Sequence, residues 1–344
     1  MAVMTVTGPV AAAQLGITLS HEHLLIDLTN QSLPGSAGKA TAITRIERDD
    51  LPRLRRDPYL MVDNLCLDNI EDAIIEVNRF RENGGSTIVD CTLSGIGRHP
   101  EKLRRIATAT GIKIVMGCGY YTYDTHPAAL RDWPVEKIRD EMLTDLLDGV
   151  GNSKIRAGII GEIGTSKNIY PDEFKVLRAA AMASEKTRAA IQVHIYPWSK
   201  NGTIAADFLL HEKVNPERIV ICHSDVAPDK DYIRQLLQRG VRVQFDNFGK
   251  EFEPDVSADS FAGGIFAKDV DRVALVAELI DGGFAPQLLI TTDICLKCLL
   301  KKNGGPGYTH ILENIAVQLQ ARGVSGETIW KTLLVENPAS LLDK

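Results

Sequence analysis

Eight short apolar runs, separated by longer segments, constrain the fold of this 344-residue chain more than any other feature. The runs are rich in Val and Ile and do not alternate with polar residues, a pattern typical of parallel strands that are buried on both faces. Parallel strands need long crossover connections between them. The runs are Gly16–Leu19, Ser86–Cys91, Ile112–Met116, Ala157–Ile160, Ala190–Val193, Arg218–Cys222, Val241–Phe245 and Gln287–Thr291.

Helical patterns lie between the runs. In Asp68–Arg81 the apolar residues recur at spacings of three and four, which places them on one face of a helix. The same spacing occurs in Asp172–Glu185, Asp231–Leu237 and Val270–Leu279. Strands that alternate with helices eight times predict an α/β fold, a (β/α)8 TIM barrel in a single domain over residues 1–344. An open doubly wound sheet is the alternative, but no Gly-x-Gly-x-x-Gly follows an early run.

The longest stretch without a periodic pattern, Thr29–Pro58, comes after the first run. Irregular segments of this length usually carry function or are disordered. In a barrel, the connection that follows a strand lies at the C-terminal face, where active sites are built. We therefore expect a long loop after the first strand, beside the active site.

Charge and cysteine content limit the partners and the compartment. The net charge of −6 argues against nucleic acid or an anionic membrane as a partner, and no apolar run approaches the ~20 residues that span a bilayer. The N-terminus has no basic segment of the kind that opens a signal peptide. The six cysteines are scattered, and the close pair Cys295 and Cys298 has no second pair to complete a zinc site. These features predict a cytoplasmic protein with a small-molecule substrate.

Metal-binding residue types stand at the ends of five of the eight runs. The spacing His21-x-His23 sends both imidazoles to the same side of an extended segment, and all strand ends share one rim of a barrel. Imidazoles and carboxylates bind divalent metals. A single histidine or acid in such a place is more often structural, so the prediction of a metal site rests on the joint pattern: His21, His23, Glu162, His194, His223 and Asp293. The other histidines do not follow this pattern, and His99 and His211 are expected to be structural.

Several segments resemble the phosphotriesterase-related family of the amidohydrolase superfamily, in its glutamate-bridged branch. They are spread from Leu19 to Ile311, and the final Glu336–Leu342 resembles the family's C-terminal helix. The matching segments read LSHEH, AGIIGEIGTS, VHIYP, VICHSD, VQFDNFGK, ITTDI and NGGPGYTHI.

The resemblance implies two divalent metal ions per chain, with zinc expected and manganese or cobalt as alternatives. The implied ligands are His21, His23 and Asp293 at the more buried ion, His194 and His223 at the more exposed ion, and Glu162 between the two. The best-known members carry a carbamylated lysine where this chain has Glu162. Glutamate supplies the same bridging carboxylate, but the difference argues against phosphotriester hydrolysis as more than a side activity. The resemblance also implies a homodimer.

A centre of this kind predicts a hydrolase. Two cations ~3.5–4 Å apart can hold a bridging hydroxide, which attacks a carbonyl, while Asp293 accepts its proton and passes it to the leaving group. The expected substrate is a lactone or carboxylic ester, with hydrolysis of an N-acyl amide as the alternative. A barrel that binds metal without turnover is the non-enzyme alternative. A mononuclear deaminase would need no bridging carboxylate, so Glu162 argues against it.

Four residues are candidates for substrate binding. Tyr120 and Tyr121 follow the third run, where an aromatic residue lines the pocket of the family that the chain resembles, and packing at the rim is an equal alternative. Lys250 and Lys297 lie close in sequence to acidic residues at strand ends and could bind an anionic substrate. The arginines of the Thr29–Pro58 stretch are interspersed with acids, which favours a solvated surface.

Overall fold

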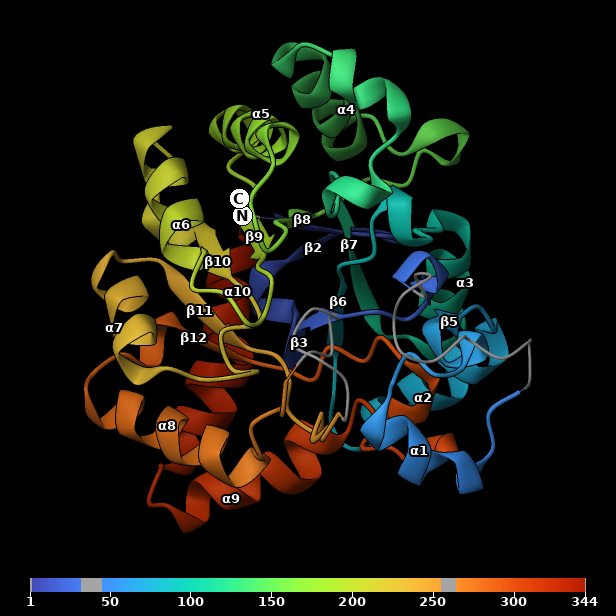
Figure 1. Cartoon of the computed structure of the whole chain (residues 1–344), viewed down its shortest axis with the longest axis vertical. Coiled ribbons are helices and arrows are strands. Elements are labelled where there is room, and N and C mark those ends of the chain that lie inside the picture. Colours follow the sequence, from blue (N-terminus) through green and yellow to red (C-terminus); the bar gives the residue numbers. More distant parts are fainter. Residues whose placement is uncertain (1, 32–44, 255–263, 344) are drawn as a thin grey trace.

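A computed structural model describes residues 2–31, 45–254 and 264–343. At its centre lies one sheet of eight parallel strands, hydrogen-bonded in the order β12-β11-β10-β9-β8-β7-β6-β3, with the helices around it (Figure 1). All eight predicted strands are confirmed. They are β3 (Thr18–Glu22), β6 (Thr87–Asp90), β7 (Lys113–Cys118), β8 (Ile159–Gly164), β9 (Ile191–His194), β10 (Ile219–Ile221), β11 (Arg242–Phe245) and β12 (Leu288–Ile290).

The strand ends differ from the predicted ones where polar residues are buried. β8 continues four residues past the expected Ile160, so Glu162 lies inside the strand and not after it. His21 likewise belongs to β3, and all five residues of that strand are buried. Hydrophobicity alone underestimates the length of these strands, because their last residues include polar side chains that are buried in the interior.

A buried side chain joins the two outer strands of the sheet, β3 and β12. The Glu22 carboxylate accepts hydrogen bonds from Thr291 Oγ1 at 2.5 Å and from the backbone amides of Thr292 and Ile294, both at 2.8 Å. Thr291 Oγ1 also donates to the His21 carbonyl at 3.1 Å. The sheet thereby closes on itself, and the predicted TIM barrel is confirmed.

Helices surround the barrel (Figure 1). The four helices predicted by periodicity are present, and each begins and ends within two residues of its predicted range. Their apolar faces are buried against the strands. The helices are α1 (Leu51–Arg56), α2 (Ile70–Glu82), α3 (Pro100–Thr110), α4 (Val135–Leu147), α5 (Pro171–Thr187), α6 (Gly202–His211), α7 (Lys230–Gln238), α8 (Asp269–Asp281), α9 (Ala316–Ala321) and α10 (Asn337–Leu342).

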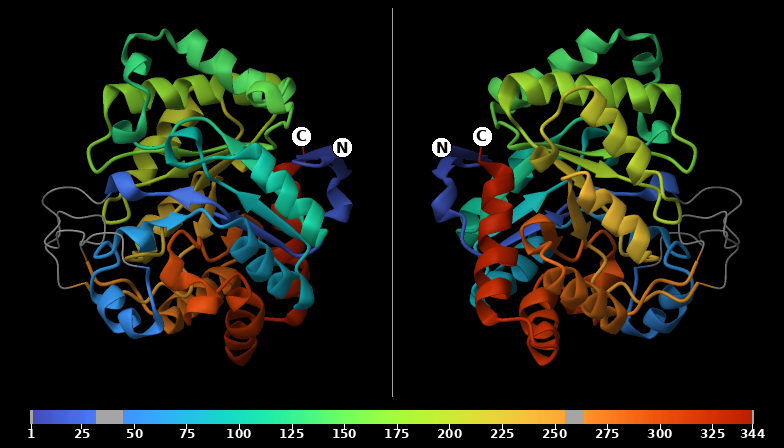
Figure 2. Two further views of the ribbon diagram at one scale, coloured as in Figure 1. Left: turned by 90° about the vertical axis from the view of Figure 1, so that its right-hand side faces the viewer. Right: turned by 90° about the vertical axis from the view of Figure 1, so that its left-hand side faces the viewer.

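The two ends of the chain lie together at one end of the barrel, away from α1 (Figure 2). Strands β1 (Ala2–Thr5) and β2 (Gly8–Ala11) form an antiparallel hairpin there, and helical turns at Thr328–Glu336 lead directly into α10. Val3 and Leu341 join the buried cluster formed by barrel side chains such as Val89 and Leu289. Neither hairpin strand was predicted. The termini thus close the end opposite the rim where active sites of barrels lie.

The predicted loop Thr29–Pro58 is only partly irregular. Residues 32–44 of it lie outside the described residues, but α1 occupies Leu51–Arg56. Pro52 stands in the first turn of α1, where a missing amide hydrogen costs nothing. The short antiparallel strands β4 (Ile26–Asp27) and β5 (Cys66–Leu67) pair the segments on either side of the loop.

Two other sequence expectations bear on the chain as a whole. Within the described ranges, no helix is long and apolar enough to cross a membrane. All six cysteines, each of which lies in a described part of the chain, are unpaired. Cys295 and Cys298 therefore form no disulfide with each other.

Candidate metal centre

Six side chains predicted as metal ligands meet at one place on the barrel rim, with Glu162 in the middle. Its carboxylate oxygens lie 3.5 Å from His21 Nε2, 3.4 Å from His23 Nε2, 3.3 Å from His194 Nδ1 and 3.0 Å from His223 Nε2. Asp293 Oδ1 completes the cluster at 3.1 Å from His23 Nε2. All six residues are at most 6% exposed, so their donor atoms are shielded from bulk water.

The donor atoms form overlapping groups that suit divalent cations. One group consists of His21, His23 and Glu162, and a second of Glu162, His194 and His223, with the donor atoms of each group within 4.8 Å of one another. Mixed imidazole and carboxylate donors are typical of zinc and of similar borderline metals. Glu162 belongs to both groups, as a bridging carboxylate would.

The surroundings of His21 indicate whether a cation fits this cluster. Both of its ring nitrogens are buried, and neither has a hydrogen-bond partner of good geometry. A buried polar atom without a partner is destabilising by about 1–3 kcal/mol. His21 Nε2 faces Glu162 and Asp293, whose carboxylate oxygens lie 3.5 and 3.8 Å away. A cation held between these groups would satisfy the nitrogen, so the residues fit a metal site.

The cluster is strongly coupled by charge. Burial raises the pKa of Glu162, but the neighbouring imidazoles, with His21 first, outweigh burial and hold this pKa well below its usual range. Burial lowers the pKa of His23, but hydrogen bonds and charge from Asp293 and Glu162 raise it to about 10. The pKa of His223 is likewise raised well above its usual value, against the effect of burial, chiefly by Asp246. Without metal, the cluster therefore holds protons at neutral pH.

These protons lead to a prediction about metal uptake. Because imidazole binds metal only in its neutral form, a cation that enters the site at pH 7.5 must displace the proton of His23, whose metal-free pKa is about 10. We expect at least one proton to be released per chain, and metal affinity to rise as the pH increases toward 10. Calorimetric titration of the metal-free protein in buffers with different ionisation enthalpies measures this release. The His99→Gln variant, changed in a helix cap outside the cluster, should release the same number. Equal heats in all buffers would contradict the prediction.

A further layer of side chains orients the imidazoles. His23 Nδ1 lies 2.9 Å from Thr92 Oγ1, and His223 Nδ1 lies 3.0 Å from Asp246 Oδ1. Such partners fix the tautomer and direction of a metal-binding ring. Sequence analysis did not identify Thr92 or Asp246 as site residues. Asp246 directly follows a predicted strand, so the strand-end criterion that selected the histidines would also have selected it, whereas the threonine at position 92 is not a residue type that the criterion includes.

The backbone at two cluster residues adopts an unusual conformation. His223 has φ +53° and Asp293 has φ +46°, in the left-handed region that side chains with a Cβ rarely adopt. Hydrogen bonds stabilise the backbone at both residues. The His223 amide donates to the Asp246 carboxylate at 3.0 Å, and the Glu22 carboxylate accepts from the amides on either side of Asp293 at 2.8 Å. Strained conformations of this kind persist where the surroundings fix them, often at functional sites.

The structure brings two of the four predicted substrate-binding residues to the cluster. The Tyr121 hydroxyl lies 3.1 Å from His194 Nδ1, and the Lys250 ammonium contacts the Asp293 carboxylate. The other two point elsewhere. The Tyr120 hydroxyl donates to Glu141, and Lys297 Nζ lies 2.5 Å from Asp63 Oδ1. The expectation that Tyr120 and Lys297 reach the site is therefore wrong, because acidic partners on other segments hold their polar ends.

A narrow space of about 30 Å³, which we call the inner chamber, adjoins the cluster. His223, Asp293 and Lys250 line it on the side of the cluster. Apolar and aromatic side chains, among them Tyr59, Phe252 and Leu296, line the rest. The inner chamber gives the cluster a small, largely apolar space in which a substrate group can lie.

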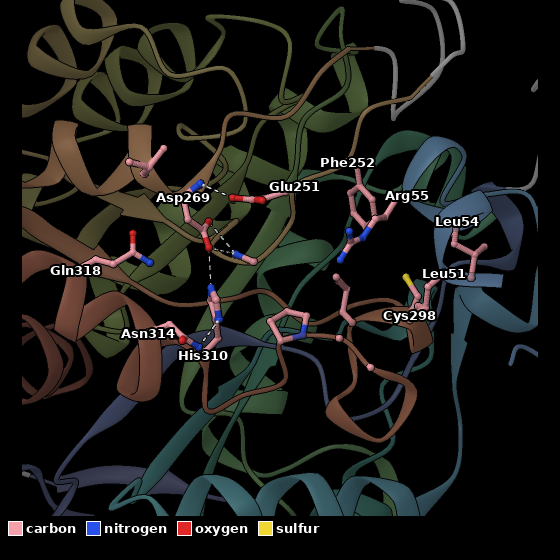
Figure 3. A pocket seen from close by; sticks show the side chains of 16 residues that line it. Leu51, Leu54, Arg55, Glu251, Phe252, Asp269, Cys298, His310, Asn314 and Gln318 are labelled. Carbon is pink, nitrogen blue, oxygen red and sulfur yellow. Dashed lines mark hydrogen bonds and ion pairs between the residues drawn. The ribbon is translucent and has the colours of Figure 1, made fainter. Parts of the chain in front are cut away.

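A larger cavity, of about 480 Å³, lies outside the cluster between α1, the start of α8 and the segment 298–318 (Figure 3). None of the six predicted ligands lines it. Its polar groups bind one another: His310 Nε2 lies 2.6 Å from Asp269 Oδ2, and Arg272 also pairs with Asp269 at 3.0 Å. His310, which the sequence left without a role, is therefore structural.

Comparison with known proteins agrees with this geometry. The profile of the Phosphotriesterase family matches residues 1–342. An N-acetyltaurine hydrolase from Danio rerio is 33% identical over 344 residues, which cover 98% of this chain and 96% of that protein. The structure of a resiniferatoxin-binding protein from Rhodobacter sphaeroides matches with a TM-score of 0.94 and 33% identity, over 99% of this chain and 95% of the other.

A third match is a mutant of a PTE-like lactonase from Deinococcus radiodurans, with a TM-score of 0.78 and 26% identity over 99% of both chains. The family match covers nearly the whole sequence, and the relatives include hydrolases of two kinds. Candidate metal ligands are clustered at the rim where barrel enzymes carry their active sites. The chain belongs to the phosphotriesterase family and is a hydrolase.

Proposed function

We propose that this protein holds two divalent metal ions, with zinc as the first candidate, and hydrolyses N-acyl amides. One observation carries the proposal: the two carboxylate oxygens of Asp293 face different partners. Oδ1 lies 3.1 Å from His23 Nε2 inside the cluster, whereas Oδ2 contacts Lys250, which lines the inner chamber. Asp293 thus links the metal ligands to the space for the substrate.

The proposed ligands divide around Glu162. His21, His23 and Asp293 would hold one ion, His194 and His223 the other, with Glu162 shared between them. When bound, such ions lower the pKa of water toward neutrality and polarise a carbonyl group.

The protein's own residues transfer the proton and orient the substrate in this proposal. Charge from Lys250 and the histidines keeps the pKa of Asp293 well below its usual range, against burial, so the carboxylate is ionised and able to accept a proton from the attacking water. Asp293 then returns the proton to the leaving nitrogen, which an amine requires before it departs. We infer that the Tyr121 hydroxyl, which lies 3.1 Å from His194 Nδ1, orients the carbonyl.

An amide is favoured over the lactone or ester that the sequence suggested first. The support is the similarity over nearly the whole chain to N-acetyltaurine hydrolases of several vertebrates, at 31–34% identity. Lactone hydrolysis is the second candidate, because a PTE-like lactonase shares the fold at 26% identity over 99% of this chain. Both reactions use the same residues and differ in the basicity of the leaving group.

Metal analysis together with a substrate screen tests the proposal. We expect two metal ions per chain, and turnover of N-acetyl amides with kcat/KM at least about tenfold above that for lactones of similar size. One ion per chain would remove the binuclear centre from the proposal. Turnover of lactones alone would replace the first candidate by the second, and metal binding without any turnover would make the barrel a binding protein.

The contact between Lys250 and Asp293 leads to a separate prediction. Lys250 is 5% exposed and its ammonium is bound to Asp293, so its main effect should be on Asp293 and not on the substrate. We expect Lys250→Met to lower kcat by about 10–100-fold for a neutral and an anionic amide alike. Steady-state kinetics with such a matched pair measures this. Lys297→Met, changed in a lysine that pairs with Asp63, is the control and should match the unchanged protein. A loss confined to the anionic substrate would instead assign Lys250 to substrate binding.

A further inference from the structure

Among the described residues, Asn247 contributes the only carboxamide to the walls of the inner chamber. It is the second residue after β11 and is 3% exposed. It follows Asp246, whose carboxylate lies 3.0 Å from the ring of the proposed ligand His223. A carboxamide offers two hydrogens on its nitrogen and an acceptor on its oxygen. The part that a substrate meets therefore depends on what holds the other part.

Two buried carboxylates take both hydrogens of Asn247 Nδ2. The nitrogen donates to Asp225 Oδ1 at 2.8 Å and to Asp246 Oδ1 at 2.7 Å. The backbone amide of Asn247 also donates to Asp225 Oδ2, at 3.0 Å. Both acids are 0% exposed, so neither contact competes with bulk water. The carboxamide therefore has no hydrogen left for a ligand.

The surroundings of the two acids fix the direction of the carboxamide. The guanidinium of Arg272, which is 0% exposed, pairs with Asp225 at 3.2 Å. The His223 amide donates to Asp246 at 3.0 Å. Both acids thus act as acceptors. A reversed carboxamide would place its oxygen against two carboxylate oxygens, which repel it, so the nitrogen of Asn247 must face the acids.

This arrangement leaves Asn247 Oδ1 as the polar atom that the residue offers to the inner chamber. No hydrogen bond within the described residues reaches this oxygen. Other polar groups on the chamber walls are already engaged. The Lys250 ammonium contacts Asp293. The ring of His223 faces Asp246 on one side and the cluster on the other. A ligand in the chamber therefore meets an uncharged acceptor beside the proposed metal ligands.

We propose, on the basis of the proposed amide hydrolysis, that Asn247 Oδ1 accepts a hydrogen bond from the amide N–H of the substrate and so determines specificity for amides. A secondary amide carries this hydrogen next to its scissile carbonyl. A lactone or an ester has an oxygen in the same place, which would face Oδ1 with no hydrogen between them. Sites that bind a donor reject analogues without it, because the acceptor in the site stays unpaired.

The test measures binding separately from turnover. The metal-loaded Asp293→Asn protein is titrated with N-acetylphenethylamine and with phenethyl acetate, in which an ester oxygen replaces the N–H. We expect the amide to bind about tenfold or more tightly. In the same background, Asn247→Leu, which is similar in size but has no acceptor, should reduce this ratio to below about threefold. Asn314→Leu, changed in the cavity that contains His310, is the matched control and should keep the full ratio.

A third ligand tests the same contact without a change at position 247. N-acetyl-N-methylphenethylamine keeps the amide carbonyl but has no N–H, so it should lose about the same factor in affinity as the ester. This comparison decides the matter if Asn247→Leu does not fold. Equal affinities of the methylated and unmethylated amides, or an amide-to-ester ratio that persists in Asn247→Leu, would overturn the role of Asn247.

The results separate this inference from the proposed function. If the preference for the amide depends on Asn247 but wild-type protein hydrolyses no N-acetyl amide, the proposed reaction fails and the binding contact stands. If wild-type protein hydrolyses N-acetyl amides and binds amide and ester equally well in the Asp293→Asn form, the reaction stands and the inference about Asn247 fails.

Discussion

Replacing Asp293 by asparagine is expected to lower kcat by about 10³-fold while most of the metal stays bound. The substitution keeps a coordinating oxygen and the shape of the side chain, but it removes the carboxylate that we propose accepts and returns the proton. Positioned acid–base groups typically contribute 10²–10⁴-fold to the rate. The Lys250 ammonium, which now contacts Asp293, would lose its counter-charge in the variant. Metal content by elemental analysis and kcat from steady-state kinetics measure the two effects on the same preparation.

A matched control distinguishes proton transfer from a general disturbance of the barrel. Asp63 is an acid that pairs with a lysine, as Asp293 does, but Lys297 lies outside the cluster. Asp63→Asn should therefore keep kcat within about threefold of the unchanged protein. A variant at Asp293 that retains near-full kcat with two bound metals would remove this residue from the chemistry. Loss of both metals would reduce its role to that of a ligand.

Replacing Glu162 by glutamine is expected to weaken the binding of at least one metal ion by about 100-fold or more, and to reduce turnover in proportion. Glu162 faces four imidazoles at 3.0–3.5 Å and supplies the negative charge that the two proposed ions share. Loss of an outer hydrogen-bond partner of a ligand costs about 10–100-fold in metal affinity, and loss of a shared ligand should cost at least as much. Competition with a chelator of known affinity measures the change.

The same variant should alter the metal-free protein. Without the Glu162 carboxylate, the pKa of His23 and of His223 should fall, because this carboxylate helps to raise both. Fewer protons should then be released when metal enters at pH 7.5. Glu141→Gln, changed in the acid that binds Tyr120, is the control and should keep both metal affinity and proton release. Unchanged affinity in Glu162→Gln would show that the two groups of ligands do not share this residue.

The sequence by itself determined the barrel and the cluster of candidate metal ligands. Eight apolar runs predicted eight strands at the observed places, since a strand buried on both faces needs a continuous apolar sequence. The alternation of side chains along a strand predicted that His21 and His23 point the same way, and both face Glu162. These inferences depend only on local periodicity and on the shared rim of a barrel. The short hairpin β1–β2 was missed because it has no such long apolar pattern.

Only the tertiary structure decided which further polar side chains reach the cluster of candidate metal ligands. Tyr120 and Tyr121 are neighbours in sequence, yet only Tyr121 reaches the cluster, because Glu141 holds the other hydroxyl. Lys250 and Lys297 are equivalent candidates in the sequence, but in the structure Lys250 contacts Asp293 in the cluster and Lys297 contacts Asp63 outside it. Each of these contacts joins residues far apart along the chain, and its geometry depends on how whole segments pack, which no local pattern encodes.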